Sequence, residues 1–183
     1  MRMKHPSPAT LLTTAGAVFV AFSVTPAFAQ KKDPTEQAVI LGQFGDWGAY
    51  TATPGGKKAC FVLSKPTSAV TDPPGRSRDA SYAFITTRPT DKVTNEVSVV
   101  VGYPQKPNHD ASATVDGKSY VLYTQNEGAW VKNAGDETLL VDAMRKGATM
   151  IIQSESGRGT KTTDTYSLRG VADALDKVAA ECK

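Results

Sequence analysis

Alternation of apolar and polar side chains predicts β-strands along most of this chain. Val97, Val99 and Val101 recur at every second position, a spacing that places all three on one face of a strand. Other short runs are rich in β-branched and aromatic residues, which favour strands. We predict strands at residues 44–50, 59–63, 81–86, 96–103, 129–131, 148–154 and 162–168.

Turn-forming residues separate these runs. Asp116 and Gly117 stand between two alternating halves of residues 113–123, which predicts a β-hairpin. Prolines and glycines interrupt residues 65–79 and residues 104–112. Because proline lacks a backbone donor and fixes φ, we expect both segments to be exposed loops.

Helical spacing of apolar residues appears twice. Residues 136–146 open with acidic side chains, close with Arg145 and Lys146, and are followed by Gly147, the pattern of one short helix. A second helix is predicted at the C-terminus by an apolar stripe with spacings of three and four, formed by Val171, Ala174, Leu175, Val178 and Cys182.

These elements predict a mainly β fold with one short helix and a C-terminal helix. An antiparallel β-sandwich, immunoglobulin-like or jelly-roll-like, is expected, with an open barrel as the alternative. A parallel α/β sheet would need a helix after nearly every strand, and the middle of the chain has none.

The first 29 residues have the three parts of a secretory signal peptide. Arg2 and Lys4 precede an apolar stretch at residues 11–24, and Ala27-Phe28-Ala29 follows as a small-x-small exit. We expect cleavage after Ala29, a flexible leader at residues 30–38 and a single domain at residues 39–183. No later apolar run reaches spanning length, so the product is expected to be periplasmic or secreted and to have no membrane span.

Charge gives no indication of a polyanionic partner. Arg2 and Lys4 leave with the signal peptide while all 18 acidic residues stay, so the formal net charge falls from +3 to +1. Nucleic acid is therefore not an expected partner. The 183 residues provide for one ordinary core, and we expect a monomer.

The two cysteines, Cys60 and Cys182, both remain after cleavage. An even count in an exported chain predicts a disulfide, and a bridge across this separation would stabilise the fold by roughly 5 kcal/mol in the loop-closure model. Cys182 lies on the apolar stripe of the last helix, the side that faces the sheet, and a disulfide to the sheet requires that position. Two free thiols, or a thiol that acts as a nucleophile, are the competing interpretation.

Catalytic motifs are lacking in this sequence. No Gly-x-Ser-x-Gly elbow, His-Glu-x-x-His pair, Walker loop or dinucleotide fingerprint occurs, and His109, the single histidine after cleavage, stands in a proline-rich loop. We therefore predict no metal, no cofactor and no enzymatic activity. The candidate surface or binding residues are Arg158, Lys161, Asp164, Tyr166 and His109.

Asp164 is notable because an acidic residue inside a strand needs a partner or solvent. It either faces solvent, pairs with Arg158 or Lys161 across the turn at residues 157–159, or belongs to a site. That turn has only a faint likeness to a phosphate-binding loop. A set of aromatic residues either lines a binding face or, as is more frequent, fills the core: Phe44, Trp47, Tyr103, Tyr120, Tyr123, Trp130 and Tyr166.

Several motifs together resemble the invasion-associated locus B family of exported bacterial proteins. They are Phe44-Gly45-Asp46-Trp47, Cys60, residues 140–147, residues 158–160, residues 163–168 and a final helix that ends at Cys182. The resemblance implies a β-sandwich exported by Gram-negative bacteria, in a family named for members linked to host-cell invasion. It implies no activity, cofactor or catalytic set. Under this resemblance, Ala143, Met144, Gly147 and Leu168 are interpreted as packing and capping positions. The two cysteines are interpreted as the disulfide that ties the C-terminal helix to the rest of the domain.

We therefore expect a non-enzymatic envelope or secreted module that binds an envelope or host protein through the loops at residues 65–79 and 104–112. The alternatives are an envelope-acting hydrolase, with a site built from Asp164, Arg158 and Tyr166, and a small-ligand-binding β-protein. A cleft with a carboxylate of raised pKa would favour the hydrolase, and a hollow interior would favour the ligand-binding protein.

Overall fold

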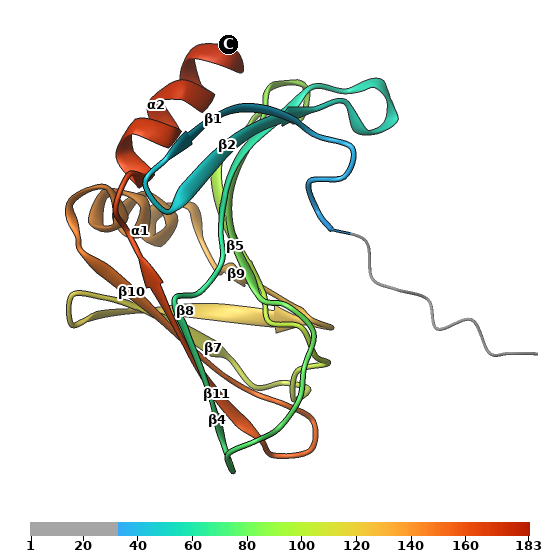
Figure 1. Cartoon of the computed structure of the whole chain (residues 1–183), viewed down its shortest axis with the longest axis vertical. Helices are drawn as coiled ribbons and strands as arrows, with labels where there is room; N and C mark the ends of the chain where they lie inside the picture. Colours follow the sequence, from blue (N-terminus) through green and yellow to red (C-terminus); the bar gives the residue numbers. More distant parts are fainter. Residues whose placement is uncertain (1–32) are drawn as a thin grey trace, which may run out of the picture. The chain divides into compact units, whose positions relative to one another are not determined.

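A computed structural model describes residues 33–183, and the predicted signal peptide lies outside them. Within these residues eleven antiparallel strands form one sheet in the order β1-β2-β3-β5-β6-β9-β8-β7-β10-β11-β4 (Figure 1). The strands are β1 Val39–Phe44, β2 Trp47–Ala52, β3 Ala59–Ser64, β4 Ser68–Asp72, β5 Tyr82–Arg88, β6 Val93–Val100, β7 Ala111–Val115, β8 Lys118–Gln125, β9 Gly128–Val131, β10 Thr149–Glu155 and β11 Lys161–Ser167. The helices are α1 Ala134–Lys146 and α2 Val171–Glu181.

The mainly β class is confirmed, as are the short helix and the C-terminal helix, but an immunoglobulin-like or jelly-roll-like sandwich is not seen. All eleven strands belong to a single sheet, whose two edge strands, β1 and β4, do not pair, so the sheet is not closed. The sheet must bend, because the connection between β3 and β4 is short. In a flat sheet β3 and β4 would lie eight strand spacings apart, about 38 Å, yet only residues 65–67 join them, a reach of roughly 15 Å.

Two predictions about local structure were wrong. Residues 68–72, expected in a loop, form β4, which pairs with β11 alone from Ser68↔Thr165 to Asp72↔Lys161. The prolines of this segment flank the strand without interrupting it, and an edge strand needs only one row of backbone partners. The run at residues 44–50 is not one strand, because a turn at Gly45, with φ of 55°, separates β1 from β2.

The hairpin at residues 113–123 is confirmed. β7 and β8 pair around Asp116 and Gly117, whose φ values of 45° and 89° are those of a tight hairpin turn with two positive-φ positions. Asp116 also accepts hydrogen bonds from the backbone N–H groups of Ala148 and Thr149, which holds the turn against the start of β10.

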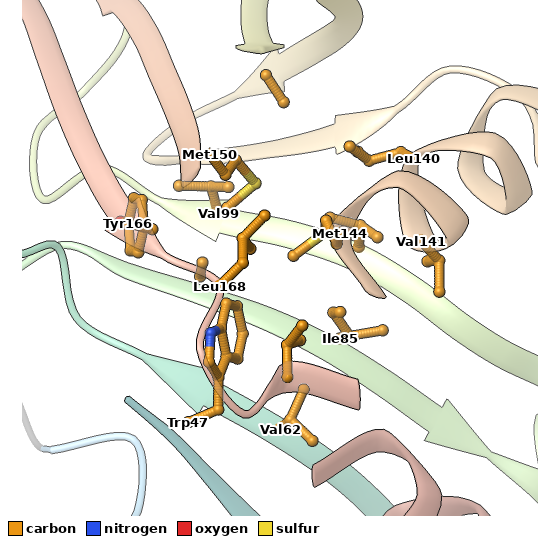
Figure 2. Close-up of a cluster of buried hydrophobic side chains, with 14 of the residues drawn as sticks. Trp47, Val62, Ile85, Val99, Leu140, Val141, Met144, Met150, Tyr166 and Leu168 are labelled. Carbon is orange, nitrogen blue, oxygen red and sulfur yellow. The ribbon is translucent and has the colours of Figure 1, made fainter. Parts of the chain in front are cut away.

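The apolar core lies between the inner face of the sheet and the two helices (Figure 2). The helix α2 packs on β1, β2 and β3, and α1 packs on β6, β7, β9 and α2. Fully buried side chains in this layer include Trp47, Ile85, Leu140, Met144, Met150 and Leu175. No helix within residues 33–183 is long and apolar enough to cross a membrane.

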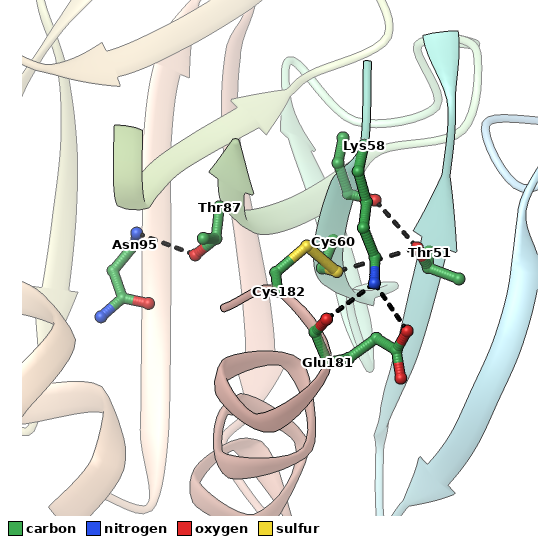
Figure 3. The surroundings of a disulfide bond; sticks show 8 residues. Thr51, Lys58, Cys60, Thr87, Asn95, Glu181 and Cys182 are labelled. Carbon is green, nitrogen blue, oxygen red and sulfur yellow. Dashed lines mark hydrogen bonds and ion pairs between the residues drawn. A yellow bond between two sulfur atoms is a disulfide. The ribbon is translucent and has the colours of Figure 1, made fainter. Parts of the chain in front are cut away.

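The predicted disulfide between Cys60 and Cys182 is present and joins β3 to the residue after α2 (Figure 3). Beside it, the ammonium group of Lys58 donates to the backbone oxygen of Glu181 at 2.7 Å and to its carboxylate at 2.8 Å. These bonds hold the end of the chain on the sheet. The free-thiol interpretation is therefore not supported.

A second link, which we call the clasp, joins the turn between β1 and β2 to the connection between β11 and α2. The backbone N–H of Asp46 donates to the carbonyl of Arg169 at 3.0 Å, and the indole N–H of Trp47 donates to the carbonyl of Ser167 at 2.9 Å. Gly170 has a φ of 91°, and a Cβ there would stand 2.1 Å from the carbonyl oxygen of Phe44. The two turns thus approach more closely than a side chain at residue 170 permits.

Replacing both cysteines, Cys60→Ser with Cys182→Ser, should lower the free energy of unfolding by about 2–5 kcal/mol, because the unfolded chain then loses its crosslink. Urea denaturation of the oxidised wild type and of the double variant measures the difference. The reduced wild type is the control and should match the double variant. Equal midpoints for all three proteins would contradict a stabilising role for the bridge.

The clasp can be tested with two glycines that share a positive φ. Gly159→Ala, where φ is 82° and no atom lies within 4 Å of the added methyl, should cost only the backbone term of about 1–2 kcal/mol. Gly170→Ala adds a collision with Phe44 and should cost at least about 3 kcal/mol in the same denaturation experiment. Equal costs would show that the close approach is not maintained in solution.

Candidate functional site

Three connecting segments meet at one end of the sheet and form a groove of about 690 Å3, which we call the loop groove. They are residues 76–79 after β4, residues 102–104 after β6, and residues 156–160 between β10 and β11. Thr71 on β4, Thr162 on β11 and Glu127 in the turn between β8 and β9 also line it. Both proline-rich segments that the sequence singled out therefore contribute to one surface feature.

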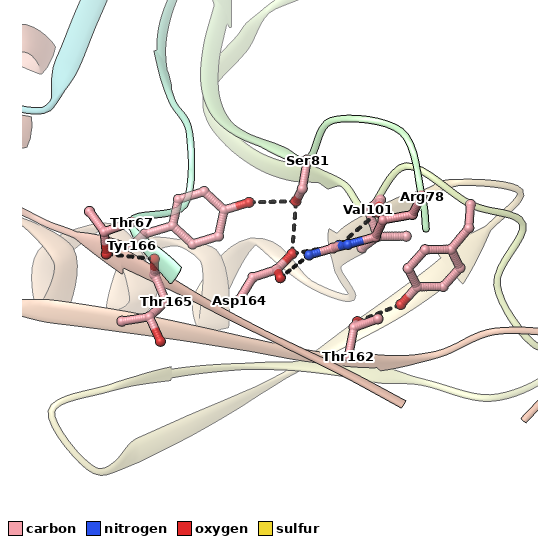
Figure 4. A network of polar contacts seen from close by, with 9 residues as sticks. Thr67, Arg78, Ser81, Val101, Thr162, Asp164, Thr165 and Tyr166 are labelled. Carbon is pink, nitrogen blue, oxygen red and sulfur yellow. Dashed lines mark hydrogen bonds and ion pairs between the residues drawn. The ribbon is translucent and has the colours of Figure 1, made fainter. Parts of the chain in front are cut away.

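A buried ion pair lies below this groove (Figure 4). The guanidinium of Arg78 donates two hydrogen bonds to the carboxylate of Asp164, one of 2.8 Å from Nη1 to Oδ2 and the other from Nη2 to Oδ1. Nη1 also donates to the carbonyl of Val101 at 2.9 Å. The Asp164 side chain is 1% exposed and that of Arg78 is 11% exposed, so the pair is almost removed from water.

Two hydroxyl groups complete this network. The hydroxyl of Ser81 donates to Oδ2 of Asp164 at 2.9 Å and shares a hydrogen bond of 2.7 Å with the phenol of Tyr166. Among the described residues, no buried side-chain nitrogen or oxygen is without a hydrogen-bond partner. Such full pairing is what a buried charge requires, since an unpaired one would be strongly destabilising.

The protonation states of the network follow from its burial. Burial raises the pKa of Tyr166 well above its ordinary value, an effect that the hydrogen bond shared with Ser81 only partly offsets. Burial alone would lower the pKa of Arg78, but the hydrogen bonds and negative charge of Asp164 raise it above its ordinary value. At neutral pH the cluster therefore holds a neutral phenol and a protonated guanidinium.

The walls of the groove are fixed by close packing between its loops. Gly102 has a φ of 79°, and a Cβ at this position would stand 2.2 Å from the backbone oxygen of Asp79. The phenol of Tyr103 shares a hydrogen bond of 2.6 Å with Thr162, and its ring centroid lies 5.9 Å from the guanidinium carbon of Arg78. These contacts tie the segment after β6 to both other walls.

The structure brings only some of the predicted site residues together. Asp164 and Tyr166 share the buried network, and Arg158 lines the loop groove above it. Lys161 and His109 instead line a second groove, where the imidazole of His109 lies 3.6 Å from the carboxylate of Glu155. Lys161 belongs to the opposite face of β11 from Asp164, because successive side chains alternate along a strand.

Sequence reasoning missed the partners of Asp164. Neither Arg158 nor Lys161 pairs with it; Arg78 does, from a position 86 residues earlier in the chain. An acidic residue within the apolar alternation of β11 indicated that a partner was needed, but nothing in the sequence distinguishes Arg78 from the other basic residues. Within residues 33–183 no group of three His, Cys, Asp or Glu side chains is placed to hold a metal ion.

Comparison with protein-family models identifies one family, and comparison with solved structures identifies a similar fold. The sequence profile described as "Invasion associated locus B (IalB) protein" matches residues 47–179. The crystal structure of invasion associated protein b from Bartonella henselae is similar with a TM-score of 0.50 at 13% identity, over 78% of this chain and 96% of that chain. At that identity the likeness is evidence for the fold alone. A comparison with curated protein sequences gave no significant match.

Removing one member of the buried pair should be more harmful than removing both. We expect Asp164→Leu or Arg78→Met alone to cost about 3–5 kcal/mol, because each leaves an unpaired buried charge. The double variant should be more stable than either single variant. Urea denaturation of the four proteins forms a double-mutant cycle, and additive costs would contradict direct coupling of the two side chains.

Proposed function

The chain belongs to the invasion-associated locus B family, and on that premise we propose that it is an exported, non-enzymatic module that binds another macromolecule through the loop groove. The observation that carries this proposal is convergence: residues 76–79 of one proline-rich segment, residues 102–104 at the start of the other, and the turn at residues 156–160 are distant in sequence but line one groove above the Arg78–Asp164 pair. Binding residues are characteristically presented on loops that a rigid scaffold positions.

Export to an oxidising compartment is part of the proposal. The signal-peptide pattern at residues 1–29 supports it, and so does the Cys60–Cys182 disulfide, since such bonds persist in the periplasm and outside the cell. The partner is accordingly expected to be an envelope or host protein.

The ionisable groups below the groove support binding over catalysis. A hydrolase built on Asp164 would need a carboxylate that reaches substrate, whereas this one is 1% exposed and accepts hydrogen bonds from Arg78 and Ser81. The raised pKa of Tyr166 keeps its phenol from acting as a base at neutral pH.

A protein that holds a small ligand inside a barrel would need a hollow interior. The inner face of the sheet is filled instead by large, fully buried side chains, among them Trp47, Met150 and Ile152. The loop groove is therefore the better candidate for contact with a partner.

Site-specific photo-crosslinking in living cells tests this function. A benzoylphenylalanine in place of Arg158, on the loop groove, should give a discrete adduct with one envelope or host protein, which mass spectrometry identifies. The matched control carries the probe at Leu139, which is 50% exposed on α1, and should not give that adduct. Replacing Arg76 by Ala in the probe-bearing protein should reduce the adduct yield, since Arg76 lines the same groove.

The proposal fails if the probe at position 158 gives no adduct, or if the same proteins are captured from position 139. It also fails if Arg76→Ala leaves the yield unchanged while Leu139→Ala reduces it, because the contact surface would then lie on α1.

A further inference from the structure

Six aromatic side chains lie on the outer face of the sheet, the face opposite α1 and α2. Each occupies a partly or largely exposed position beside a buried neighbour that points inward, as in Phe61 between Cys60 and Val62. We call this set the aromatic strip: Tyr50 on β2, Phe61 on β3, Tyr82 and Phe84 on β5, Tyr123 on β8 and Trp130 on β9. An outward-facing set of this size is unusual in a soluble domain and marks a contact surface.

The strip consists of two clusters of rings. In the first, the ring centroids of Tyr50 and Phe61 lie 5.3 Å apart with nearly parallel planes, and Phe84 lies 6.1 Å from Phe61. In the second, the rings of Tyr123 and Trp130 stack at 5.6 Å. Ring pairs at these distances form extended apolar surfaces.

Strand register places the two clusters in one row. Phe84 on β5 is opposite Ser98 on β6, which is in turn opposite Trp130 on β9, and Trp130 is opposite Tyr123 on β8. The clusters are thus separated by two strand spacings, about 10 Å, with the short side chain of Ser98 between them.

Glycines keep two of the rings close to the sheet. A Cβ at Gly128 would stand 2.1 Å from the indole of Trp130, and a Cβ at Gly48 would stand 2.6 Å from the ring of Tyr50. Both rings therefore lie over backbone that has no side chain of its own. Glycine within a strand weakens it and characteristically marks such a close approach.

One end of the strip is recessed. Phe61 and Phe84, with Thr86 and Arg88, line a groove of about 610 Å3 whose far wall is formed by Pro34, Gln37 and Ala38. An aromatic floor with a few polar groups at its margin is the usual composition of a ligand site.

One cation beside the strip is paired with a carboxylate and another lies over an aromatic ring, which restricts the ligand. The guanidinium of Arg88 donates to the carboxylate of Glu96 at 2.9 and 3.1 Å, and the ammonium of Lys65 lies 5.5 Å from the ring centroid of Tyr82. Nucleic acids and anionic lipid surfaces are bound by clusters of uncommitted cations. The complement of this surface is instead a neutral molecule with apolar ring faces and many hydroxyl groups.

We propose that the aromatic strip binds a neutral glycan chain of β-linked pyranose units. Sugar rings carry C–H groups on their faces, which pack against aromatic rings, while their hydroxyls bond to polar groups at the edges. The separation of the two clusters allows rings two units apart in an extended chain to stack on Phe84 and on the Tyr123–Trp130 pair. Ser98 and Thr86 provide hydroxyl partners. The site shares no residue with the loop groove and extends the function beyond it.

Binding of cellohexaose and chitohexaose to the full mature protein, measured by isothermal titration calorimetry, tests this inference. At least one of them should bind, and Tyr123→Ala and Phe84→Ala should each weaken binding about three- to tenfold. Tyr123→Phe keeps the ring and should retain the affinity. Leu139→Ala, the control, removes a side chain with 50% exposure on α1, compared with 41% for Tyr123, and should have no effect.

Three results would overturn the proposal. The first is no binding of either hexasaccharide by wild-type protein whose circular dichroism shows it folded. The second is binding that the strip variants leave unchanged. The third is a sedimentation velocity experiment in which the protein is a dimer and Tyr123→Ala makes it a monomer. Arg158→Ala on the loop groove should not alter glycan binding, so this test and the crosslinking experiment fail independently.

Discussion

The clasp between the β1–β2 turn and the β11–α2 connection is the constraint on which this fold depends. The sheet is not closed, so no backbone hydrogen bonds between strands hold β1 and β2 near β11. The core nevertheless requires these strands to cover the same apolar layer. The hydrogen bonds from Asp46 and Trp47 to the backbone of residues 167–169 supply that connection. The disulfide acts at the other end of α2, so the last helix is fixed at both ends against β1 to β3.

The inner face of the bent sheet is apolar beside the helices and polar at the loop end. Asp164 and Tyr166 alternate along β11 with outward-facing threonines, and Arg78 reaches them from the segment after β4. A buried ion pair contributes little net stability relative to apolar packing, since desolvation offsets most of its Coulomb energy. Its geometric consequence is larger: three hydrogen bonds from one guanidinium fix an otherwise irregular loop to β11 and to Val101, the residue after β6. The loop groove depends on this anchoring.

Local patterns predicted those elements whose residues follow one period throughout. The alternation at Val97 to Val101, the Asp116-Gly117 hairpin and the apolar stripe of α2 all depend on short-range sequence. The short edge strand β4, the order of strands and the Arg78–Asp164 pair depend on the chain's long-range path, which no local period encodes. The burial of the aromatic residues was likewise not predictable from short-range sequence. Trp47, Tyr120 and Tyr166 are buried as the frequent case predicts, whereas Tyr123 and Trp130 lie on the outer face, and only strand register distinguishes them.

The motifs that carry the family resemblance lie mainly in the scaffold. Phe44 to Trp47 form one half of the clasp, and residues 140–147 pack α1 into the core and end it. Most residues of the two proposed binding surfaces, including Arg76, Arg78, Tyr103, Tyr123 and Trp130, stand outside those motifs. Asp164 and Tyr166 belong to a family motif and also contact the loop before β5. Asp164 accepts hydrogen bonds from Arg78, and Tyr166 shares a hydrogen bond with Ser81. The motifs therefore supply most of the support below the groove and, at Arg158 and Thr160, part of its lining, while the rest of the lining lies outside them.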